Sequence, residues 1–75
     1  MPKPIITRVR KLRSKRDLRA EIVGLAAAAL ERKAPGELHV IAPLINPDTI
    51  RAEWKRVLPA LSDEVRGRLS LIVDE

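Results

Sequence analysis

A short apolar run between two stretches with helical spacing constrains the fold of this chain more than any other feature. Residues 37–45, Glu-Leu-His-Val-Ile-Ala-Pro-Leu-Ile, are apolar on both alternating faces, which is typical of a strand covered on both sides. Residues 69–74, Leu-Ser-Leu-Ile-Val-Asp, predict a second strand. Strands joined by a crossover helix normally lie parallel, with a right-handed connection. The sequence therefore predicts an α/β fold, a small parallel sheet of the βαβ type with two main helices.

The first helix is predicted over residues 14–33. Ser14 is a good N-cap, and Asp17 three residues later resembles the acid of a capping box and suits the positive end of the helix. Apolar residues then recur at helical spacing until Pro35 ends the pattern. Gly24, in the middle of this helix, either admits a neighbouring backbone or is neutral.

The second helix lies between the two apolar runs. It begins at Asn46, a good N-cap, and Pro47 suits the first helical position. Trp54 belongs to its apolar stripe and is expected in the core, whereas Glu53 faces away from that stripe. Pro59 should break or kink this helix.

Two parallel strands do not make a stable sheet, and the sequence leaves three ways to complete it open. Residues 4–10 alternate like a half-exposed edge strand, which would extend the fold to βαβαβ. Alternatively, strands pair across a dimer, or the chain is a piece of a longer protein. We divide the chain into residues 1–13, a basic arm or edge strand, and residues 14–75, a single small α/β domain. Because so narrow a sheet leaves edges and apolar faces uncovered, we expect a homodimer or larger assembly.

The residue types that are missing exclude several kinds of site. The chain has no Cys, a single His and a single aromatic residue. Disulfides, thiolate metal sites and His-based metal clusters are therefore excluded, and recognition of bases by aromatic stacking is disfavoured. No glycine-rich turn precedes the first helix, so no nucleotide cofactor is expected. We expect no cofactor, no metal and no catalytic residue, no membrane span and no secretory signal, and a cytoplasmic location.

Charge is distributed unevenly along the chain. Residues 1–19 contain eight Lys or Arg and one acid, a net charge of +7, whereas residues 20–75 contain seven and nine, a net charge of −2. A basic block of this density favours a polyanionic partner, above all nucleic acid, contacted through its phosphates. The candidate nucleic-acid-binding residues are Arg8, Arg10, Lys11, Arg13, Lys15, Arg16 and Arg19.

The start of the first helix is the most specific position within this block. A phosphate there would meet free N–H groups, the positive helix end and nearby cations. Its contacts would be Arg10, Lys11, Arg13, Ser14 and Lys15. The alternative interpretation is a solvated basic face.

These patterns favour a non-enzymatic binding or dimerisation domain of a nucleic-acid-associated protein, such as a transcriptional regulator. Two alternatives stay open. A fragment or half-site of an α/β enzyme would bring Asn46, Asp48 and Asp74 together, with Glu75, at the carboxyl ends of the strands, where oxygen ligands suit a divalent cation. A structural oligomerisation module would instead use the basic arm to contact acidic patches on its partner. His39 is expected to be a packed residue of the first apolar run.

Overall fold

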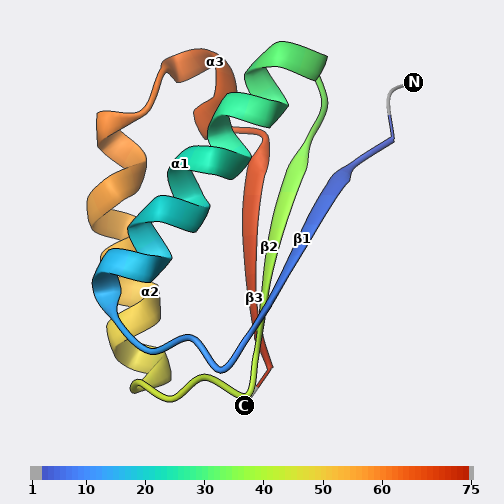
Figure 1. The fold of residues 1–75 in the computed structure, drawn as a ribbon. Helices are drawn as coiled ribbons and strands as arrows, with labels where there is room; N and C mark the ends of the chain where they lie inside the picture. The colour runs from blue at the N-terminus through green and yellow to red at the C-terminus, as the bar shows by residue number, and fades with distance from the viewer. Residues whose placement is uncertain (1–2, 75) are drawn as a thin grey trace.

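The computed structural model describes residues 3–74 as two layers, a parallel sheet and a layer of helices (Figure 1). In chain order the elements are β1 (Ile5–Arg10), α1 (Lys15–Arg32), β2 (Gly36–Ile41), α2 (Pro47–Val57), the 3₁₀ turn η1 (Leu58–Ala60), α3 (Asp63–Arg66) and β3 (Leu69–Asp74). The sheet has the order β1-β2-β3, and both pairs of neighbouring strands are parallel. The predicted α/β class is therefore confirmed, and residues 5–10 supply the third strand of the βαβαβ alternative.

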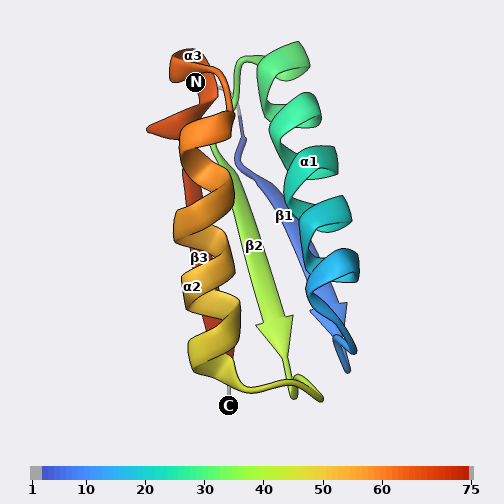
Figure 2. The same ribbon diagram turned by 90° about the vertical axis from the view of Figure 1, so that its left-hand side faces the viewer.

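The two crossover connections, through α1 from β1 to β2 and through α2 from β2 to β3, lead in the same direction across the sheet. Two right-handed crossovers that advance the same way place their helices on the same face. Figure 2 shows this arrangement, with α1 and α2 side by side in front of the three strands. One face of the sheet is thus covered and the other is open.

The core lies between the sheet and the two long helices. Its fully buried members come from both layers, because every second strand residue points at the helices. They are Leu18, Ile22, Leu38, Val40 and Ile50. Trp54 on α2 joins this cluster with 9% of its surface exposed, so its predicted place in the core is confirmed.

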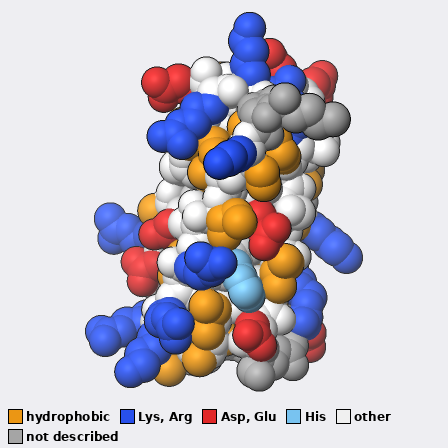
Figure 3. Space-filling model, turned by 90° about the vertical axis from the view of Figure 1, so that its right-hand side faces the viewer, with side chains coloured by type: hydrophobic (Ala, Val, Ile, Leu, Met, Phe, Trp, Pro, Cys, Tyr) orange, Lys and Arg blue, Asp and Glu red, His pale blue; other side chains and the backbone are white. Residues whose placement is uncertain are grey.

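The open face of the sheet corrects one expectation. We predicted that the strand after the first helix is covered on both sides, but Glu37, His39 and Ile41 lie half-buried on the face without helices. Ile6 and Ile72, on the outer strands of that face, are 46% and 43% exposed. Figure 3 shows this face as a mixture of apolar and charged side chains around the histidine. The apolar character of this run reflects its central position in the sheet rather than a second covering layer.

The helix ends follow the local signals in the sequence. The Ser14 hydroxyl accepts a hydrogen bond from the Asp17 N–H at 3.2 Å, and the Asn46 side chain accepts one from the Asp48 N–H at 2.8 Å. α1 ends at Arg32 and is capped by Lys33, whose φ of 52° lies in the left-handed region common at helix C-termini. The predicted caps of both helices are confirmed.

The strand predicted over residues 37–45 is displaced and shorter, at Gly36–Ile41. Ala42 has a φ of 48°, and its N–H donates to the Asp74 carbonyl at 3.1 Å. The left-handed residue turns the chain out of the sheet, and Pro43 has no N–H with which to continue the ladder. After it, Ile45 packs against the core, whereas Leu44 is 61% exposed.

Candidate nucleic-acid interface

The turn between β1 and α1 is fixed by backbone contacts to the next turn of the fold. Lys11 has a φ of 55°, and its N–H donates to the Ile41 carbonyl at 3.1 Å. Leu12 is buried in the core, and its carbonyl accepts from the Leu44 N–H at 2.8 Å. The turn between β1 and α1 is therefore held in place by the buried Leu12, which anchors the exposed cations Lys11 and Arg13 on either side of it.

Six of the seven predicted phosphate-binding cations surround this turn. Arg8 and Arg10 lie on the open face of β1, and the others follow in the turn and in the first turn of α1. All six side chains are exposed, and within residues 3–74 none has a hydrogen-bond or ion-pair partner. We call this set the basic end: Arg8, Arg10, Lys11, Arg13, Lys15 and Arg16.

Arg19, the seventh candidate, has a different environment. Its Nε lies 3.8 Å from Oε1 of Glu53, and Arg56 Nη1 lies 3.9 Å from Oε2 of the same carboxylate. Only 4% of the Glu53 side chain is exposed, so our expectation that this residue faces away from the core was wrong. The reason is that α1 packs against the flank of α2 and covers it. Arg19 thus serves the contact between the two helices.

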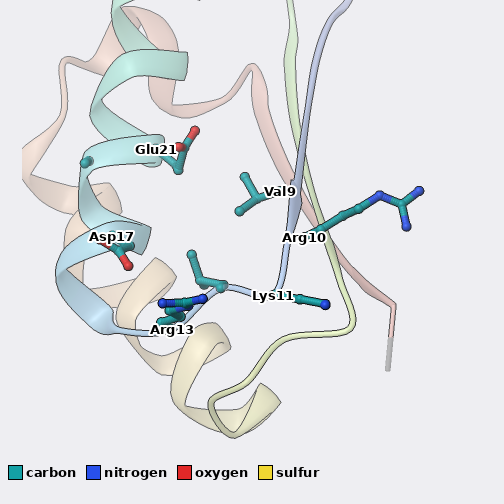
Figure 4. A pocket seen from close by; sticks show the side chains of 8 residues that line it. Val9, Arg10, Lys11, Arg13, Asp17 and Glu21 are labelled. Atoms are coloured by element: carbon teal, nitrogen blue, oxygen red, sulfur yellow. The ribbon is translucent and has the colours of Figure 1, made fainter.

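A hollow of about 310 Å³ lies between β1 and the start of α1. In Figure 4, Val9 and Glu21 face each other across it, whereas Arg10 and Lys11 point away. Asp17 also lines the hollow, so both acids of this part of α1 stand where a phosphate would have to enter. Such carboxylates repel an anion. The geometry therefore argues against an enclosed phosphate site at the helix start and leaves the cations as an open, exposed surface.

Two of the polar residues considered for a cation site have partners at the start of α2. Asn46 caps α2 and Asp48 pairs with Arg51, with 3.1 Å between Asp48 Oδ1 and Arg51 Nη1. Asp74 ends β3, and Glu75 lies outside the described residues. Residues 3–74 contain no group of three or more His, Asp or Glu side chains that could hold a metal ion. The carboxyl edge of the described sheet gives no support to the enzyme alternative.

The exposed apolar side of α1 was missed at the sequence level. A groove of about 260 Å³ runs between this helix and the segment η1–α3, lined by Val23, Leu30 and Leu61 among others. Val23 and Leu30 are both exposed. Residues 22–30 contain no charged residue, and this stretch was the sequence feature that could have indicated an exposed apolar side of the helix.

Comparison with known proteins adds no relative. No protein-family model matches the chain, and no curated protein or solved structure is significantly similar to it. In the described part of the chain, every helix is too short or too polar to cross a membrane.

Proposed function

We propose that this chain is a non-enzymatic domain of a cytoplasmic nucleic-acid-associated protein, such as a transcriptional regulator, and that it binds phosphates through its basic end. One observation carries the proposal. Six exposed cations gather around a single turn, and none is neutralised by an acid within residues 3–74. By contrast, Arg19, Arg51, Arg56 and Arg66 each pair with a carboxylate.

The mode of binding follows from the residue types. Lys and Arg side chains replace the counterions around phosphates, whatever the base sequence. The only aromatic residue, Trp54, is buried in the core and is not offered to bases. Binding of this kind weakens steeply with salt, and it distinguishes little between sequences.

The test measures fluorescence anisotropy of labelled duplex and single-stranded oligonucleotides over a salt series. If about four to six phosphates are contacted, the plot of log K against log salt should be linear, with a slope of roughly −3.6 to −5.4 for duplexes and roughly −2.8 to −4.2 for single strands. Reversing Arg10, Lys11, Arg13 and Arg16 to Glu should weaken binding to all sequences alike, by roughly 100-fold at low salt.

A matched control reverses four exposed cations that lie outside the basic end and changes the net charge equally: Lys3, Arg32, Lys33 and Lys55. The proposal expects the control to bind far more tightly than the basic-end variant. If both variants lost affinity equally, the loss would depend on net charge alone and not on the basic end. No binding by the unmodified chain at low salt would reject nucleic acid and favour the structural oligomerisation module.

A further inference from the structure

The two edges of the sheet expose their backbones through different residues. In β1, the Ile5 N–H donates to the Pro35 carbonyl at 2.8 Å and the Lys11 N–H to the Ile41 carbonyl at 3.1 Å. Odd-numbered residues of β1 therefore turn their backbone groups toward β2. By alternation, the outward N–H and C=O groups of this edge belong to residues 6, 8 and 10.

At β3 the alternation of inward and outward backbone groups is reversed. The Gly36 N–H donates to the Arg68 carbonyl at 3.0 Å, and the Ala42 N–H donates to the Asp74 carbonyl at 3.1 Å. Even-numbered residues of β3 thus face β2. The outward backbone groups belong to Leu69, Leu71 and Val73.

Only one of these edges is protected against pairing. Two of the three outward residues of β1 are exposed arginines, and Pro4 immediately precedes the strand. Charges and prolines are the usual protection of an edge strand. β3 has no Lys, Arg or Pro between Leu69 and Val73, and its outward residues are apolar and only half-buried. β3 is therefore an open template for another strand.

We propose that β3 pairs antiparallel with β3 of a second copy of this chain, across a two-fold axis at Leu71. In this register Leu71 faces Leu71 of the partner subunit, and Leu69 faces the partner's Val73. Every outward backbone group of β3 then gains a hydrogen bond, whereas a shift by two residues leaves the outermost groups unpaired.

Side chains support the same register. Directly opposed residues of an antiparallel pair lie on the same face of the sheet. Leu69, Leu71 and Val73, which point toward the helices, would meet only apolar residues and extend the core. The second copy is the partner that completes this strand in both hydrogen bonding and apolar contact.

This interface goes beyond the proposed phosphate binding and does not depend on nucleic acid. The basic end lies on β1 and α1, and β1 is the strand farthest from the two-fold axis. Pairing through β3 therefore leaves the phosphate-binding residues of both copies uncovered. Loss of the interface and loss of phosphate binding can be observed separately.

Amide hydrogen exchange of the unmodified chain tests the edge directly. We expect slow exchange at Leu69, Leu71 and Val73 that slows further as protein concentration rises. The matched internal control is fast exchange at Ile6, Arg8 and Arg10. Sedimentation should give about twice the chain mass of 8.4 kDa. A monomer whose two edges exchange equally fast, or protection confined to β1, would overturn the proposal.

Two charge variants test the register, because Ser70 and the partner's Ile72 stand opposite each other in it. Both positions are exposed on the open face, so the monomer should tolerate the changes. S70K/I72K places lysine opposite lysine and should raise the dimer Kd by roughly tenfold. S70E/I72K retains the net charge and places glutamate opposite lysine, and it should dimerise within about threefold of the unmodified chain. Equal dimerisation of the two variants would overturn the register, and S70K/I72K should still bind oligonucleotides if the phosphate proposal is right.

Discussion

Two glycines illustrate how the same residue type has opposite roles in this chain. Gly24 is exposed in α1, and an added Cβ would meet no atom within 4 Å. The close backbone approach that the sequence allowed at this position does not occur among the described residues. Gly36 starts β2, and a Cβ there would lie 2.9 Å from Leu69 Cδ2 and 3.0 Å from Leu25 Cδ1. One glycine is dispensable, and the other makes room for core side chains.

Replacing each glycine with alanine should therefore change stability in opposite directions. Gly24→Ala should raise the free energy of unfolding by about 1 kcal/mol, because glycine is a poor helix former. Gly36→Ala should lower it by roughly 1–3 kcal/mol, because the leucines must move. Urea titration followed by circular dichroism measures both. A destabilised Gly24→Ala protein would show that this helix face is in close contact with another chain.

At the scale of elements, the contact between α1 and α2 depends on a buried acid. Glu53 is almost inaccessible, and Arg19 and Arg56 approach it from the two helices, with side chains 51% and 75% exposed. Either arginine alone can offset the charge of the carboxylate. Removal of both leaves an uncompensated charge at the helix contact.

A double-mutant cycle tests this arrangement. Arg19→Ala and Arg56→Ala should each cost about 0.5–1 kcal/mol, since both arginines are largely solvated. The double variant should cost roughly 3 kcal/mol, more than the sum of the two. Arg16→Ala is the control, because it removes an unpaired cation from α1, the helix that carries Arg19. It should change the free energy of unfolding by no more than about 0.5 kcal/mol. Additive losses in chemical denaturation would contradict a shared buried carboxylate.

At the scale of the whole molecule, a three-stranded parallel sheet is narrow and has one face open to solvent. A second copy at β3 would double the sheet, and binding of the folded state to itself stabilises that state by mass action. Folding and assembly are then thermodynamically linked.

The Tm of the unmodified chain should accordingly rise with protein concentration. For a domain of this size we expect roughly 5–10 °C over a hundredfold range of concentration. S70K/I72K, measured over the same range by differential scanning calorimetry, should show a much smaller rise. A Tm of the unmodified chain that is independent of concentration would count against dimerisation.

Much of the local structure could be predicted because it depends on neighbours in the chain. Ser14 and Asn46 cap their helices by accepting bonds from residues two or three positions later. The spacing of Leu18 and Ile22 puts both on one side of α1. The strand–helix order made parallel pairing the expected outcome. The clustering of cations along residues 8–16 is likewise a property of the sequence alone.

The surroundings of these residues were decided only by the tertiary structure. Both helices lie on one face because the two crossovers advance in the same direction, and this left the second face of β2 open. Glu53 is buried because α1 covers its side of α2, a contact between residues distant in sequence. Which backbone groups of β1 and β3 face outward depends on the register of the sheet. Sequence patterns determine local conformation through nearby atoms, whereas exposure and edge position depend on how distant segments pack.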